Sequence, residues 1–189
     1  MDAIEALTTR VSGVALVGPA PDELELHTIL SAALRAPDHG RLRPWRFIVV
    51  RGAARNRLGE LMGEALRRRH PDATPAQVDK ERNRPLRAPL ILVVAAKVDE
   101  GSHIPAIEQV LSAGAAAQNV MIAAFALGFG CAWKTGEAAY DLDIKAAFDL
   151  APADAIVGFL YVGSNASPPP PPAKPDPSDH VVEWSDRTS

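Results

Sequence analysis

Histidine, cysteine and glycine patterns in this sequence can be compared with the spacings that known chemistries require. The histidines form no HExxH pair and Cys131, the one cysteine, has no CxxC partner, so we expect no metal site. Asp38 and His39 are adjacent, but there is no GxSxG elbow of the kind that carries a hydrolase nucleophile. Neither a GxGxxG fingerprint nor a GxxxxGK[ST] loop is present, which argues against Rossmann and P-loop sites. These patterns predict no catalytic side chain.

Four short fragments carry the remaining candidate groups for binding chemistry. They are Arg10 with Ser12, Arg35 with His39, the run PWRF at 44–47 and the run WKTG at 133–136. Arginine presents a planar set of donors suited to anions. Each fragment also has a purely structural interpretation. Arg35 could interact with a helix C-terminus, His39 could be a turn residue, and Trp45 and Trp133 could be core aromatics.

Apolar periodicity predicts the elements that would position these fragments. Helices are expected at 2–9, 21–35, 54–69, 75–84, 104–127 and 141–150, and strands at 46–50, 90–96, 129–134, 156–162 and 180–184. Asp22 is a candidate helix cap and Gly128 a helix terminator. Residues 167–177 include seven prolines and should be extended and stiff. The result is an α+β domain in which a small mixed sheet packs against helices.

Composition limits the class of protein. A chain of 189 residues suits one domain, and a formal charge of −3 with one cysteine favours a cytoplasmic protein with no nucleic-acid or membrane partner. The apolar stretch 110–133 contains Ser112, Gln118 and Asn119, so a buried helix is favoured over a membrane span. Its small side chains at 113–117 would let another helix approach closely, and a symmetric dimer would bury it.

The fragments, taken in order, resemble the nitroreductase family, and in particular its short, YdjA-like branch. The blocks that carry the resemblance are MDA at 1–3, RVS at 10–12, RAPDHG at 35–40, PWRF at 44–47, RAPLILVVAAK at 87–97, EQ with SAGAA over 108–116, GFGCAWKTG at 128–136, IVGFLYVG at 156–163 and the Pro-rich tail. Their order and spacing are more specific than any one block. The resemblance covers nearly the whole chain.

The resemblance implies a nitroreductase-like fold in an intertwined homodimer, with two FMN sites at the subunit interface. Residues 1–166 would form one FMN-binding domain. Residues 167–189 would form a Pro-rich C-terminal arm whose terminal strand docks on the partner subunit. The implied activity is that of an NAD(P)H-dependent oxidoreductase. It would pass a hydride through FMN to a nitroaromatic, a quinone or a similar small acceptor, with ping-pong kinetics.

The resemblance also implies site residues, which the two subunits share. The FMN contacts would be Arg10, Val11, Ser12, Arg35, His39, Trp133, Lys134 and Thr135. A stretch similar to one assigned to the nicotinamide nucleotide comprises Ala123, Ala124, Phe125, Ala126, Leu127 and Gly128, although such residues also suit a helix core. Arginine would recognise the FMN phosphate in a bidentate manner.

The sequence departs from the family at two positions in the N-terminal fragment. Val11 stands where close relatives have Arg or His, and Val14 stands where many members have a cation. Fewer positive groups would then surround the flavin from this segment, and Lys134 is a candidate for supplying charge instead.

Two alternatives to an enzyme stay open at this point. One is a flavin-binding dimer that acts as a flavin store or redox sensor without turnover. The other is a helical interaction domain that binds no cofactor.

Overall fold

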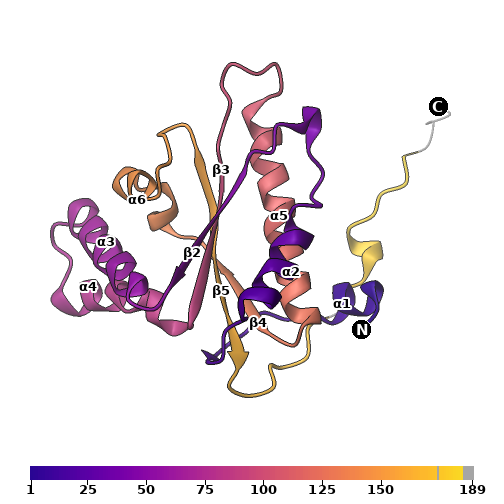
Figure 1. Ribbon diagram of the computed structural model, residues 1–189, viewed down its shortest axis with the longest axis horizontal. Helices are drawn as coiled ribbons and strands as arrows, with labels where there is room; N and C mark the ends of the chain where they lie inside the picture. Colours follow the sequence, from indigo (N-terminus) through magenta and orange to yellow (C-terminus); the bar gives the residue numbers. More distant parts are fainter. Residues whose placement is uncertain (174, 185–189) are drawn as a thin grey trace.

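A small antiparallel sheet forms the centre of the molecule (Figure 1). The computed structural model describes residues 1–173 and 175–184. The strands are β1 (Leu16–Val17), β2 (Trp45–Arg51), β3 (Leu90–Ala96), β4 (Gly130–Lys134) and β5 (Ala155–Asn165). Their order is β1-β5-β3-β2, and β4 pairs with β5 as well. The long strand β5 therefore connects the sheet to β4, which carries one of the candidate fragments.

The structure corrects one detail of the expected sheet, which was predicted to be mixed. All pairs between named strands in the described part of the chain are antiparallel. The parallel contact is an isolated bridge between Ser12 and Cys131. Apolar periodicity identifies strands one at a time and holds no information on their relative direction, which is why the sequence did not settle this point.

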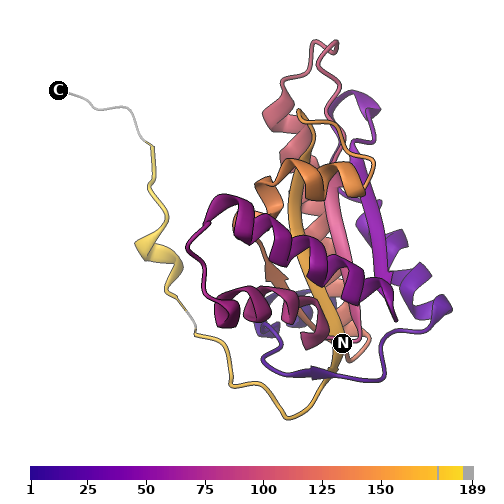
Figure 2. The same ribbon diagram turned by 90° about the vertical axis from the view of Figure 1, so that its left-hand side faces the viewer.

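Helices cover both faces of the sheet (Figure 2). One face packs against α2 (Glu23–Ala33) and α5 (Ala106–Ala126), and the other against α3 (Ala54–Arg69) and α6 (Leu142–Ala147). Two further helices, α1 (Ala3–Thr9) and α4 (Pro75–Arg82), lie against α5 and α3 respectively. Short 3-10 helices are η1 (His39–Arg41), η2 (Arg84–Arg87), η3 (Glu137–Tyr140) and η4 (Pro177–Asp179).

Strand β3 shows why its sequence is a continuous apolar run. Leu92 and Val94 belong to the core on the α5 side, whereas Ile91 and Val93 belong to the core on the α3 side. Successive side chains of a strand point to opposite faces. A strand covered on both faces is therefore apolar throughout, as predicted from the sequence.

Helix α5 packs its small residues against the sheet and α2. Ala113, Ala117 and Val120 are fully buried there. By length and composition this helix could cross a membrane, but its buried face belongs to the core of the fold, as the sequence predicted. On the outer face Ile107 and Leu111 stay exposed in the single chain.

Helix ends follow the predicted signals. Asp22 caps α2 in a capping box with Glu25, so the first turn has its free N–H groups satisfied. Gly128 follows α5 with a φ of +90°, a conformation that glycine adopts without strain. Asp22 and Gly128 are thus confirmed as a cap and a terminator.

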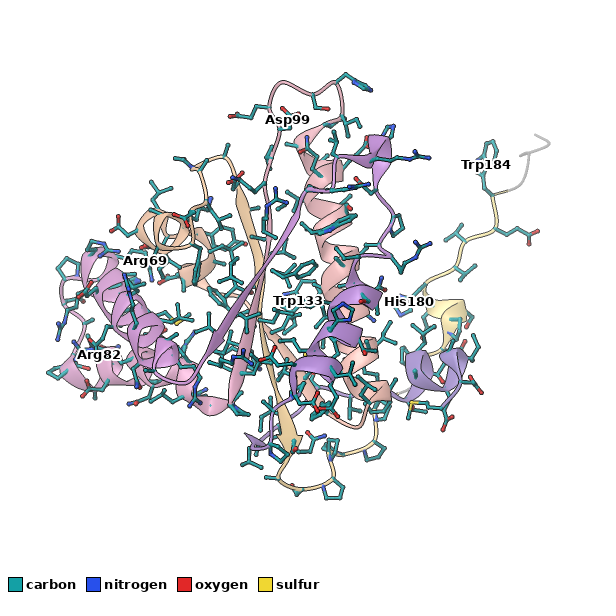
Figure 3. All side chains as sticks on the ribbon, in the orientation of Figure 1. Arg69, Arg82, Asp99, Trp133, His180 and Trp184 are labelled. Carbon is teal, nitrogen blue, oxygen red and sulfur yellow. The ribbon has the colours of Figure 1, made fainter. Side chains whose placement is uncertain are left out.

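The C-terminal arm leaves the body of the molecule (Figure 1). The predicted strand at 180–184 is not formed in the single chain, where η4 precedes an irregular segment. Val182 and Trp184 are 91% and 92% exposed, and Trp184 points away from the domain in Figure 3. A strand needs a neighbour for its backbone N–H and C=O groups, so docking on a partner stays a prediction.

Candidate functional site

A pocket of about 590 Å³ lies where the segment after α1 meets the end of β4. Its polar and charged lining residues are Ser12, Arg84, Arg87, Lys134 and Thr135. Met62, Phe159 and Tyr161 contribute apolar surface from α3 and β5. The structure therefore brings Ser12 of the RVS fragment and Lys134 and Thr135 of the WKTG fragment to one pocket, whereas Arg10, Val11 and Trp133 are not among its lining residues. Their shared role in binding FMN stays a prediction.

The N-terminal segment is attached directly to β4. Ser12 forms the parallel bridge with Cys131, and the N–H of Gly13 donates to the carbonyl of Cys131 at 3.0 Å. Leu16 then begins β1, which pairs with Asn165 of β5. These backbone contacts place the Ser12 side chain, which is exposed, at the pocket.

Arg10 caps the C-terminal end of α1 and turns its guanidinium inward. Its Nε and Nη1 atoms are buried and have no hydrogen-bond partner among the described residues. The positive charge of Arg10 is close to Cys131. Burial raises the pKa of the Cys131 thiol to about 12, and the nearby Arg10 charge opposes part of that rise. A buried donor without an acceptor is costly. The guanidinium therefore suits an acceptor that comes from outside this chain.

Trp133 has a structural role in addition to any binding role. Its Nε1–H donates to the carbonyl of Val157 at 3.1 Å, and a Cβ on Gly158 would lie only 2.2 Å from that nitrogen. The ring lies near the centre of the molecule (Figure 3). It anchors the end of β4, so that Lys134 and Thr135 emerge at the pocket.

Arg84 and Arg87 are pocket residues that the sequence analysis did not single out. They are three residues apart in η2, a spacing that aligns side chains on one side of a 3-10 helix. An Nη of Arg84 lies 2.8 Å from a Glu81 carboxylate oxygen. Burial raises the pKa of the Tyr161 hydroxyl above its usual value, and the positive charges of Arg84 and Arg87 oppose part of that rise. In the sequence, the two arginines just before the apolar run of β3 were the signal that could have identified this part of the pocket.

Arg35 and His39 lie elsewhere in the chain, beyond the end of α2. His39 Nδ1 is 2.6 Å from a carboxylate oxygen of Glu108, near the N-terminal end of α5. Arg10 follows α1, which lies beside the other end of α5 (Figure 1). At a rise of 1.5 Å per residue this helix is about 30 Å long. Within one chain, His39 and Arg10 therefore lie near opposite ends of α5.

The remaining candidates from the sequence differ in how deeply they are buried. Trp45 is buried in the core, which confirms its structural interpretation. Val11 is half-buried, and Val14 is 80% exposed at the pocket. In the stretch 123–128, Ala124 is fully buried, whereas the residues at 126–128 are exposed. The Ala124 side chain therefore serves the core, and the other residues of the stretch stay a prediction.

Comparison with known proteins places this geometry in a family. The model of the nitroreductase family matches residues 18–164. The chain is 41% identical over 164 residues to the protein named "Putative NAD(P)H nitroreductase YdjA" from Escherichia coli, covering 87% of this chain and 88% of that protein.

Solved structures share the fold. A nitroreductase-like family protein from Bacillus cereus superposes with a TM-score of 0.83 at 23% identity, covering 97% of this chain and 96% of that one. A protein from Desulfovibrio desulfuricans described as "a putative nitroreductase in complex with fmn" superposes with a TM-score of 0.72 at 22% identity, with 96% of each chain covered. The order of the sequence blocks, the sheet with its flanking helices and these matches agree, and the chain belongs to the nitroreductase family of oxidoreductases.

Proposed function

We propose that the protein is an FMN-dependent NAD(P)H oxidoreductase that acts on a nitroaromatic, a quinone or a similar small acceptor. The observation that carries the proposal is the buried guanidinium of Arg10, whose Nε and Nη1 have no partner within the described residues. Arg10 follows α1 and lies two residues before Ser12, which lines a pocket whose volume falls in the usual range for small-ligand sites. The name of the E. coli relative and the FMN complex of the Desulfovibrio protein support the same assignment.

The residues that line the pocket, together with Arg10, have the charges and donors that FMN requires. Arg10 and Ser12 bind the phosphate, which carries a charge of about −2 at neutral pH. Lys134, Arg84 and Arg87 also line the pocket and supply further positive charge. They replace the cations that Val11 and Val14 do not provide. When bound, FMN supplies hydride transfer from NADH or NADPH to the acceptor, so the chain needs no nucleophile of its own.

The proposed active form is a homodimer with shared sites. Arg10, Ser12 and the segment at 133–135 bind FMN from one subunit, while Arg35 and His39 bind it from the other. The separation of His39 from Arg10 along α5 supports this arrangement. The exposed Ile107 and Leu111 of α5 are apolar surface that a second copy would cover.

The test is reduction of the bound flavin. Purified protein is loaded with FMN, desalted and mixed with NADH or NADPH in a stopped-flow instrument. The proposal predicts loss of the oxidised flavin absorbance, followed by its return when a quinone or nitroaromatic is added. Flavin that stays oxidised with both nucleotides would overturn the enzyme proposal.

A second candidate is a flavin store or redox sensor that binds FMN without turnover. The observation that favours it is the pair Val11 and Val14, which lowers the positive charge contributed by the N-terminal segment. The same experiment separates the candidates, because a store binds FMN but shows no rapid reduction by either nucleotide.

A further inference from the structure

The EQ-x-x-S run of α5 contacts the loop that carries His39. Glu108 and Ser112 are four residues apart, so their side chains lie on the same face of the helix. The Ser112 hydroxyl donates to the carbonyl of Pro37 at 2.7 Å, and Glu108 accepts from His39 Nδ1 at 2.6 Å. One helix face thus holds both the backbone of this loop and the imidazole ring.

The loop is constrained on its other sides as well. Asp38 accepts from the N–H of Arg43 at 2.8 Å. Arg41 and Arg43 have positive φ angles of 58° and 50°, a conformation that side chains other than glycine adopt only when their surroundings impose it. A Cβ on Gly40 would lie 2.2 Å from Ile104. The backbone at His39 is therefore fixed, and the ring orientation depends on Glu108.

We infer that Glu108 is a positioning residue that fixes the proton of His39 on Nδ1 and leaves Nε2 free for the flavin nucleotide. A carboxylate has no proton to donate, so the close Nδ1 contact requires a hydrogen on that nitrogen. The role toward the nucleotide rests on the proposed function. With side-chain exposures of 64% and 41%, the pair contributes little to folding stability, so its consequence is orientation.

The first test reads the tautomer of His39 in the full chain without FMN. Nitrogen–proton NMR of the imidazoles is recorded at a pH where they are neutral, and His39→Ala identifies the signal. Wild-type protein and Glu108→Gln, whose amide oxygen still accepts, should show the Nδ1–H form. Glu108→Ala should shift His39 toward the Nε2–H form that a free imidazole prefers. The matched control Glu64→Ala changes an exposed glutamate of α3 and should leave the signal unchanged.

The second test measures the dissociation constant of FMN by quenching of flavin fluorescence. Glu108→Ala and His39→Ala should each weaken binding about fivefold, the effect of one lost hydrogen bond. The double variant should bind no more weakly than His39→Ala, because Glu108 acts through the histidine. Melting temperatures of the FMN-free variants should match that of the Glu64→Ala control.

The outcomes distinguish this inference from the proposed function. The role of Glu108 would be overturned if Glu108→Ala left the tautomer of His39 unchanged. It would also be overturned if the losses of FMN affinity in the two single variants added in the double variant. Neither result would affect the proposed binding of FMN by Arg10. If the wild type binds no FMN, the proposed function falls and the nucleotide role of His39 falls with it. The NMR result then still decides whether Glu108 positions the ring.

Discussion

Arg10 combines burial with unused hydrogen-bonding capacity, so its replacement should affect the FMN-free and FMN-bound proteins differently. Arg10→Ala should weaken FMN binding by about 1.5–3 kcal/mol, as expected for a lost hydrogen bond to a charged group. The melting temperature of the FMN-free protein should not fall, because the two buried nitrogens have no partner to lose among the described residues. Fluorescence titration and thermal melts measure the two quantities.

The control for this substitution is Arg57→Ala, which removes an exposed arginine of α3 and should change neither quantity. Equal FMN affinity in Arg10→Ala and wild type would mean that Arg10 is not a phosphate contact.

Cys131 predicts a pH dependence of stability. Burial raises the pKa of its thiol from 9.0 to about 12. The folded state therefore holds the proton more tightly than the unfolded state. The resulting stability is present below pH 9 and is lost as the pH rises toward 12, at about 1.4 kcal/mol per pH unit. Denaturant titrations across this range should show a steeper decline in wild-type protein than in Cys131→Ala. Parallel pH profiles would contradict the buried neutral thiol.

At the residue scale, sequence predicted part of the pocket. Ser12 and Lys134 were singled out, and the structure brings both to one cavity. Arg84 and Arg87 were missed because their pocket position depends on how η2 packs against α3 and α4, which no local pattern encodes. In the proposed dimer, the position of His39 relative to a flavin depends on a second subunit, so the sequence spacing within one chain says little about it.

Helices α3 and α4 approach so closely that a glycine is required between them. A Cβ on Gly59 would lie 2.2 Å from the backbone oxygen of Arg82. Gly59→Ala should therefore destabilise the fold by about 1–3 kcal/mol, the usual cost of overpacking. Glu64→Ala on the exposed face of the same helix should stay within about 0.5 kcal/mol of wild type. Chemical denaturation measures both, and a stabilised Gly59→Ala variant would show that α4 moves away freely.

At the element scale, the periodic segments were predicted best. The apolar run of β3 contributes to the cores on both faces of the sheet, and the small-residue face of α5 packs in one of them, as their patterns indicated. The direction of strand pairing was not predictable, since it depends on how the helices between strands return the chain. The segment at 180–184 has the composition of a strand but no neighbouring strand in one chain, so it is irregular there.

At the scale of the whole molecule, the C-terminal arm is the part that the proposed dimer would change most. Its exposed Val181, Val182 and Trp184 are apolar surface without cover in the single chain. Deleting residues 178–189 should loosen the proposed dimer, because burying these side chains stabilises association. Sedimentation at low protein concentration measures this, with deletion of 185–189 as the control. An unaltered profile for the longer deletion would argue against docking of the arm.

The central claim is that FMN binds at the pocket lined by Ser12 and Lys134, with Arg10 as a further contact, and that a second subunit completes the site. An absorption spectrum of the purified protein, taken after incubation with FMN and desalting, tests this most directly. The account predicts oxidised flavin bands that correspond to one FMN per chain, two in each dimer. Protein that is colourless after this treatment would contradict the claim.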